Sequence, residues 1–232
     1  MPFFVIPLLS INSKKLRIFA LTLCALSLST VSAQAFHGPF AGVQVGYSQS
    51  KPTLSHTLGK LSGTTKPTLT NWLLGGHGGY GRTFDNKFYL GTELFVTYDG
   101  LGDVTKDYVL TQGTSRTATV AKIGRSYSFG ADLRLGFQFE AGGSEMLIYT
   151  GPTFQFSQWT ARGTTITEGS QINAKESLLM GFGGNLGYEI RLKREVSVGF
   201  VGKYIRFKDA KFLHLKVASS AFSGSVYFNI HM

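Results

Sequence analysis

Segments in which apolar residues alternate with small or polar ones recur from about residue 40 to the C-terminus of this chain. Residues 222–232 show the pattern most clearly: every second position is apolar or glycine, and the positions between them carry Ser, Tyr, Asn or His. Successive side chains of a β-strand point to opposite faces, so this segment is predicted to form a strand with one apolar and one polar face. Repetition of the pattern along the chain predicts an all-β fold.

The first 35 residues do not follow this pattern and have the features of an export signal. A basic segment at 14–17 precedes an apolar run at 18–28, which is too short to cross a bilayer. Residues 33–35, Ala-Gln-Ala, have the small-x-small form of a leader-peptidase site. We therefore expect residues 1–35 to be a cleaved signal peptide and residues 36–232 to form the exported domain.

The amino-acid composition limits which folds and which chemistry we expect of the exported domain. The chain contains 29 glycines, which disfavours a helix bundle and suits the sharply bent strands of a small barrel. Its only cysteine, Cys24, lies in the expected leader, so we expect no disulfide and no thiol chemistry in the exported domain. The formal net charge is +10, yet no basic residues cluster in a nucleic-acid-binding motif. We expect neither a nucleic-acid partner nor a cofactor.

Connections of alternating length determine the predicted topology. Short turns at 85–87, 141–144 and 193–195 alternate with long connections. Outer-membrane barrels have short periplasmic turns and long outer loops. The pattern predicts an eight-stranded antiparallel up-and-down transmembrane β-barrel of this kind. The expected strands lie at about 40–48, 69–83, 88–98, 127–138, 146–156, 178–191, 196–204 and 222–232.

A soluble β-sandwich is the alternative to this barrel. The barrel is favoured because aromatic residues crowd the apolar face of the strands while charged residues occupy the other face. Two irregularities are expected. Pro152 cannot donate to a ladder and predicts a bulge in the fifth strand. A change of phase near Ser219 predicts either a bulge or a separate hairpin at the start of the last strand.

Four segments carry a resemblance to a known family: residues 40–47 (FAGVQVGY), 88–94 (FYLGTEL), 129–137 (FGADLRLGF) and the final strand. In these segments the chain resembles the OmpA-like or opacity-type family of small outer-membrane barrels, over essentially the whole exported domain. The resemblance implies a location in the outer membrane of a Gram-negative cell. It also implies that the barrel assembly machinery recognises the last strand. Many members end on Phe, whereas Met232 holds that position here.

The polar face of the expected strands carries charges that a small barrel would bury, because eight strands leave an interior just wide enough for side chains. Glu93 and Arg134 lie on neighbouring antiparallel strands and are expected at similar depth. We predict a mixed-sign network that closes the lumen through charge-assisted hydrogen bonds. An ion or proton path lined by the same groups is the alternative. The predicted members are Glu93, Asp132, Arg134, Glu189 and Lys203.

The first and fourth long connections are basic. The first contains lysines and no acid, and in the fourth Asp209 is the only acid. Since the last strand closes on the first, these connections are expected to form a basic rim at the level of lipopolysaccharide phosphates, where each basic group contributes about 1 kcal/mol. Ordinary solvated loops are the alternative. The candidate residues are Lys51, Lys60, Lys66, Lys208 and Lys211.

These features favour a monomeric, non-enzymatic barrel with a structural or surface-interaction role in the cell envelope. Its expected partners are membrane lipid, lipopolysaccharide or a host surface, and the assembly machinery. A narrow, low-conductance porin for small solutes is the second possibility. A lipid A-modifying enzyme is the third, and it would need a nucleophile within reach of a histidine. Ser55, His56 and His214 are the weak candidates for that chemistry.

Overall fold

The structure, a computed structural model, describes residues 36–58, 61–66, 68–99, 104–112, 115–165, 171–212 and 215–232. The expected signal peptide lies outside these residues. The part of the chain that is described consists of strands and their connections, and none of it is a helix long and apolar enough to span a membrane. The strands are β1 (Gly38–Leu58), β2 (Leu61–Thr65), β3 (Leu69–Thr83), β4 (Phe88–Tyr98), β5 (Val104–Gln112), β6 (Ser115–Ala141), β7 (Ser144–Thr165), β8 (Gln171–Lys193), β9 (Val196–Phe207), β10 (Ala210–Phe212) and β11 (Leu215–His231).

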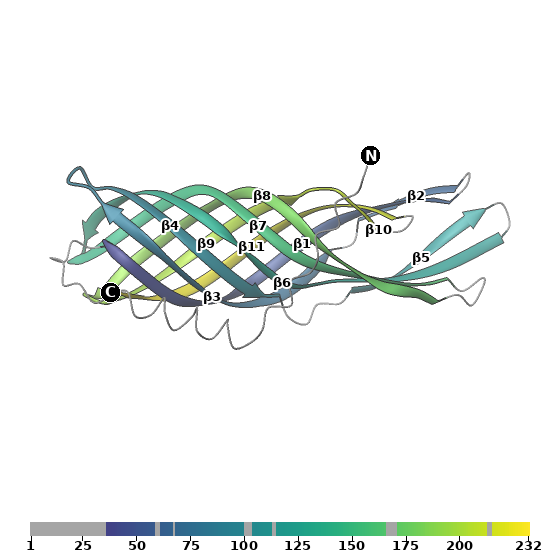
Figure 1. The fold of residues 1–232 in the computed structure, drawn as a ribbon, viewed down its shortest axis with the longest axis horizontal. Coiled ribbons are helices and arrows are strands. Elements are labelled where there is room, and N and C mark those ends of the chain that lie inside the picture. The colour runs from purple at the N-terminus through teal and green to yellow at the C-terminus, as the bar shows by residue number, and fades with distance from the viewer. Residues whose placement is uncertain are drawn as a thin grey trace, which may run out of the picture. The chain divides into compact units, whose positions relative to one another are not determined.

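Eight antiparallel strands form a closed barrel in the order β1, β3, β4, β6, β7, β8, β9 and β11 (Figure 1). The barrel closes where β11 pairs with β1, in a register that runs without interruption from Phe40 opposite His231 to His56 opposite Leu215. This topology confirms the predicted fold. The three remaining strands extend hairpins at one end: β2 pairs with β1, β5 with β6, and β10 with β11 (Figure 1).

Tight turns join the strands at the opposite end, at the three predicted places. The turn between β6 and β7 contains Gly142 and Gly143, whose φ angles are 62° and 76°. Two successive positive φ angles match a two-residue hairpin turn to the twist of its strands, and glycine adopts them without steric cost. In the turn between β3 and β4, Lys87 also has a positive φ, and its backbone amide donates to the Phe84 carbonyl at 2.9 Å.

Segments expected as long loops are largely strand. β1 continues to Leu58 rather than ending near residue 48, and β6 begins at Ser115 rather than near residue 127. The reason is that side-chain alternation reports which residues face lipid, whereas a ladder needs only backbone partners. Lys51 has such a partner in Ser220 of β11, although its own side chain is exposed. The polar sequence therefore marks where the barrel leaves the apolar layer, not where the sheet ends.

The predicted bulge at Pro152 is wrong. The register between β6 and β7 is the same on both sides of the proline, with Asp132 opposite Thr153 and Leu135 opposite Thr150. Pro152 therefore interrupts this ladder without adding a residue. At the start of β11, the structure has the second of the two expected forms, a separate hairpin with β10, and the register with β1 does not shift near Ser219.

Exposed and buried side chains alternate along the barrel strands, and β4 does so without a break. Leu94 is 68% exposed on the outer face, whereas its neighbour Glu93 is 3% exposed on the inner face. Near the hairpin end, Tyr47 and Trp72 meet edge to face on the outer surface with ring centroids 6.0 Å apart. An apolar exterior with aromatic residues near one end is the arrangement that transmembrane barrels present to lipid and its interface.

This arrangement predicts that the effect of a charge on the outer face depends on depth. Leu94→Arg places a charge in the middle of the apolar surface and should destabilise the folded barrel by about 2–4 kcal/mol, measured by urea unfolding in lipid vesicles. Leu192→Arg makes the same chemical change at the turn end of β8 and should cost only about 0–1 kcal/mol. Equal losses for the two variants would contradict the assignment of this surface to lipid.

Candidate functional site: the charged lumen

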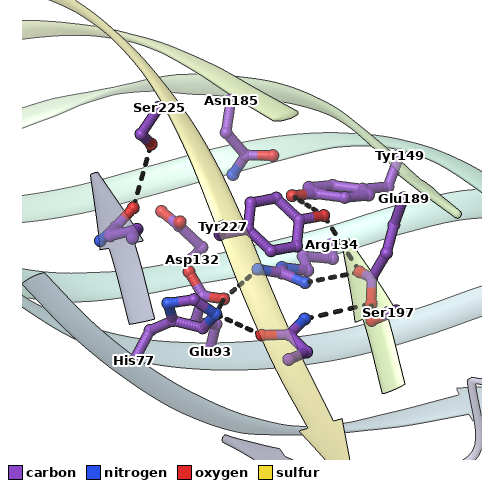
Figure 2. Close-up of polar contacts among 12 residues, drawn as sticks. His77, Glu93, Asp132, Arg134, Tyr149, Asn185, Glu189, Ser197, Ser225 and Tyr227 are labelled. Atoms are coloured by element: carbon purple, nitrogen blue, oxygen red, sulfur yellow. Dashed lines mark hydrogen bonds and ion pairs between the residues drawn. The ribbon is translucent and has the colours of Figure 1, made fainter. Parts of the chain in front are cut away.

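The inner face of the barrel brings five charged side chains from four strands into one cluster. Glu93 of β4 lies directly opposite Asp132 of β6, and Lys203 of β9 lies opposite Asn185 of β8. All five charged residues expected in the lumen network are buried, with exposed fractions of 6% or less. They belong to one group of contacts, whose members are Glu93, Asp132, Arg134, Glu189 and Lys203. Figure 2 shows the first four of these residues.

Arg134 lies at the centre of this cluster. Its Nη2 donates to Glu93 Oε2, and its Nη1 lies 3.6 Å from Glu189 Oε2 (Figure 2). Its guanidinium carbon is 4.5 Å from the ring centroid of Tyr149 and 5.0 Å from that of Phe40. A planar guanidinium can stack on aromatic faces while its edge pairs with carboxylates, so Arg134 both neutralises and fills the centre of the lumen.

Glu189 accepts hydrogen bonds from several side chains near the turn end of the lumen. Ser197 Oγ and the Asn229 amide nitrogen donate to Oε1, the latter at 3.1 Å, and the Tyr227 hydroxyl donates to Oε2 at 3.0 Å (Figure 2). His231 Nε2 lies 3.2 Å from Oε1. A buried carboxylate with this many donors is satisfied in its ionised form.

Lys203 connects the two acids at the other side of the cluster. Its Nζ is 2.6 Å from Asp132 Oδ2 and 3.8 Å from Glu93 Oε1. The same Nζ lies 3.6 Å from the ring centroid of Phe95, which is buried below it. Lys203 therefore has a partner for its charge on each side and an aromatic face for its remaining surface.

A relay through an amide couples Glu189 to His77. The Asn229 side chain donates its Nδ2 to Glu189, which turns its Oδ1 toward His77 Nε2 at 2.6 Å (Figure 2). Because an amide oxygen can only accept, His77 must carry its proton on Nε2. The His77 ring also lies edge to face with Tyr227, at a centroid distance of 5.5 Å. Glu189 thus sets the tautomer of His77 through Asn229, without contacting His77 itself.

A second ion pair, which the sequence analysis missed, lies nearer the hairpin end. Arg125 Nη2 donates to Asp99 Oδ1 at 2.7 Å and to Ser48 Oγ at 2.8 Å, while Ser128 Oγ donates to Asp99 Oδ2 at 2.8 Å. Asp99 and Arg125 are both buried. Asp99 directly follows β4 and continues the alternation of its inward-facing residues. This alternation could have identified Asp99 as a lumen residue from the sequence.

Strict alternation gives the wrong face for Arg125. Along β6 the even-numbered positions from Ser128 onward face inward, so an odd-numbered residue would be expected to face outward. The pairing of β6 with β7 shifts between Arg125 and Ser128, and this irregularity turns Arg125 into the lumen. A one-residue shift in register exchanges the two faces of a strand, and no local sequence signal marks it here.

The rim lysines are only partly described. Lys51, Lys66 and Lys208 are exposed, with Lys51 on β1 and the other two in the connections that follow β2 and β9. Lys60 lies outside the described residues. Lys211 lies on β10, in a segment whose side chains are not described. The structure therefore places three of the five candidates at the surface.

One group in the lumen has the residue types of a catalytic triad. Ser197, His231 and Glu189 lie within contact distance, but His231 uses the same Nε2 toward the serine at 2.8 Å and the carboxylate at 3.2 Å. A serine nucleophile needs a histidine that contacts the serine through one ring nitrogen and its orienting acid through the other, so this group does not form a catalytic triad.

No group of three metal-ligating side chains is found among the described residues. Ser55 and His56 lie on β1 in a segment whose side chains are not described, and His214 lies outside the described residues.

A closed antiparallel barrel with an apolar exterior and a polar, side-chain-filled interior is an outer-membrane β-barrel fold. The eight-stranded form agrees with the expectation drawn from the OmpA-like or opacity-type resemblance. Comparison with models of protein families and with curated proteins finds no match.

The chain is similar to several solved outer-membrane structures. Neisserial surface protein A is 14% identical, with a TM-score of 0.40, over 83% of this chain and 99% of that one. The outer membrane protein OprG of Pseudomonas aeruginosa is 14% identical, with a TM-score of 0.43, over 87% and 99%. The outer membrane protease OmpT of Escherichia coli is 11% identical, with a TM-score of 0.44, over 89% and 100%.

The central position of Arg134 predicts a large loss of stability when its side chain is removed. Arg134→Ala leaves Glu93 and Glu189 buried without their shared cation, which should cost about 3–5 kcal/mol in urea unfolding. Arg82→Ala is the matched control, because Arg82 is exposed and its guanidinium lies 5.3 Å from the Phe84 ring. That control should lose less than about 1 kcal/mol. A small loss for Arg134→Ala would mean that water already solvates the two carboxylates.

Proposed function

We propose that this protein is a non-enzymatic outer-membrane barrel with a closed lumen, which stabilises the envelope and presents its hairpin end to lipopolysaccharide. The observation that carries the first part is the buried network around Arg134. Each charge in it has an opposite charge within 4 Å, and its aromatic members fill the space between the charges. A conducting pore would instead need charges whose partners are water.

The outer surface of β11 supports assembly by the outer-membrane machinery. Phe228, Ile230 and Met232 are exposed at the end of the chain, in the apolar phase that such a terminal strand presents. The resemblance stated above attributes recognition to this strand. The terminal residue here is Met rather than Phe, so the aromatic contact would come from Phe228.

The closed lumen predicts that the purified protein does not conduct. Inserted into a planar bilayer, it should give no resolvable single-channel current, because the paired charges and aromatic rings around Arg134 would leave no continuous water path. A water-filled barrel of comparable size provides the positive control in the same bilayer. Steady channel openings in the unmodified protein would favour the low-conductance porin and contradict the closed lumen.

Basic side chains above the aromatic residues support the second part of the proposal. Lys51 of β1 and Arg206 of β9 are both exposed and both lie opposite Ser220, from its two sides. Adjacent strands are about 4.8 Å apart, so the two backbones are separated by about 10 Å, with an uncharged serine between them. Lys208 is exposed two residues beyond Arg206. This spacing can hold an anionic phosphate between two cations.

The level of these residues also suits a headgroup. Lys51 lies four residues beyond Tyr47 on the outer face of β1, and Arg206 lies two residues beyond Tyr204 on that of β9. Tyr47 and Tyr204 are exposed aromatic residues at the edge of the apolar surface, where such side chains mark the membrane interface. The cations therefore lie just outside the hydrocarbon layer, where lipopolysaccharide carries its phosphates.

The basic rim predicts binding that depends on salt. Changing Lys51, Arg206 and Lys208 together to Gln should weaken binding to lipopolysaccharide, by about 1 kcal/mol for each charge at low salt. The loss should shrink as salt is raised, since exposed charges are screened. Gln at Arg82, Lys87 and Lys193 removes three exposed cations from the opposite end and is the control. Titration calorimetry that finds equal affinity for both triple variants would contradict the rim.

A further inference from the structure

The lumen contains two separate groups of buried polar contacts, and the cluster around Arg134 is only the inner one. The outer one is the Asp99–Arg125 ion pair, held by the hydroxyls of Ser48 and Ser128. Ser128 contacts Ser157 at 2.6 Å, and Gln155 donates to Ser157 at 2.9 Å, so the hydrogen bonds continue onto β7. The outer group therefore spans the lumen from β1 through β4 and β6 to β7.

Apolar side chains complete the outer group. Trp159 of β7 lies opposite Arg125 in the sheet, is 1% exposed, and packs edge to face on Phe207 of β9 at a centroid distance of 5.9 Å. Polar contacts thus cover one side of this level of the barrel, and large apolar side chains cover the other.

A small cavity separates the two groups. Its lining includes Asp99 and Arg125 of the outer group and Lys203 of the inner one, together with Gln44 and Ser225. Ser225 Oγ donates to Gln44 Oε1 at 3.0 Å, and Figure 2 labels Ser225 and marks this bond with a dashed line. Gln44 Nε2 and Arg125 Nε are buried and have no acceptor among the described protein atoms. The cavity has a volume of about 20 Å³, which is enough for one water molecule, and these two donors could bind it.

The carboxylates at the centres of the two groups lie far apart along the barrel, although members of both groups line the cavity between them. Asp99 lies six residues beyond Glu93 along the chain, which corresponds to roughly 20 Å of extended strand. Among the described residues, no hydrogen bond or ion pair joins a member of the outer group to Glu93, Asp132 or Arg134. At that separation, and with no shared partner, changes at Asp99 and at Glu93 should have additive energies. Loss of one group should therefore leave the other in place.

We propose that the lumen is closed by two independent seals in series, the outer one at Asp99, Arg125 and Trp159 and the inner one at Arg134 and Tyr149, with a hydrated chamber at Ser225 between them. This inference rests on the closed lumen of the proposed function and specifies how that lumen is closed. Opening either seal admits solvent from one end only, and conduction requires both to open.

A cysteine placed in the chamber tests the two seals separately. The exported domain has no cysteine, so Ser225→Cys can be introduced into the full chain together with Cys24→Ser as the only thiol. Asn86→Cys, on the exposed turn between β3 and β4, is the accessible control. A charged methanethiosulfonate reagent is then applied in three backgrounds: unmodified, Arg125→Ala with Trp159→Ala, and Arg134→Ala with Tyr149→Ala. Heat-dependent migration on a gel shows that each variant is folded, and Gln replaces Ala at either arginine if one is not.

The thiol at position 225 should be protected in the unmodified background. It should react at least about tenfold faster when either seal is opened, because only a thiol that water reaches ionises and reacts. Neither variant should conduct, since the other seal remains. Rapid labelling in the unmodified background, labelling that responds to one seal only, or conduction by a single-seal variant would each overturn the two-seal arrangement. Conduction by the unmodified protein would instead refute the closed lumen itself.

Discussion

The pairing of β11 with β1 is the constraint on which the rest of the structure depends. Within hydrocarbon no water satisfies an unpaired backbone group, so a sheet that crosses a membrane must close on itself. Closure at eight strands also sets the width of the lumen, which leaves room for side chains and little else. Inward glycines adjust that room locally. A Cβ at Gly79 would lie 2.7 Å from the Phe40 ring, and one at Gly130 would lie 2.8 Å from the Phe95 ring. The glycines therefore make space for aromatic rings that the narrow interior could not otherwise hold.

A narrow interior that contains charges must pair them. Removing an ion from water is so costly that its partners have to be close and well oriented. The structure meets this requirement through shared partners: Arg134 contacts Glu93 and Glu189, while Lys203 contacts Asp132 and Glu93. Because each acid or base of the inner group is tied to the next, no member can reorient alone. Such a network contributes less to net stability than to the selection of a single packing of the lumen, since apolar side chains of the same volume would serve stability at least as well.

Alternation and turn chemistry made the barrel predictable from the sequence. The bounds of β3 and β4 follow from pattern alone, and so do the three tight turns and the inward phase of Glu93, Arg134 and Lys203. The other features of the fold and the site depend on contacts between residues that are far apart in the sequence. The extension of β1 beyond residue 48 depends on backbone partners in β11, which side-chain polarity does not report. The inward position of Arg125 depends on a register shift against β7. The role of Tyr149 depends on how its ring meets Arg134 across the lumen, and that contact requires the closed barrel.

The three tight turns have a consequence for the order in which the barrel is made. Each joins two strands that are adjacent in both sequence and space, so the hairpins β3–β4, β6–β7 and β8–β9 can form by closing short loops, which costs little chain entropy. The seam between β1 and β11 joins opposite ends of the domain, and contacts of such high sequence separation form slowly. The folding chain therefore passes through an open sheet in which the edges at β1 and β11 are unpaired. Unpaired edges can pair with other chains, so the chain has to enter the membrane and close before that happens. The finished barrel has no such edge.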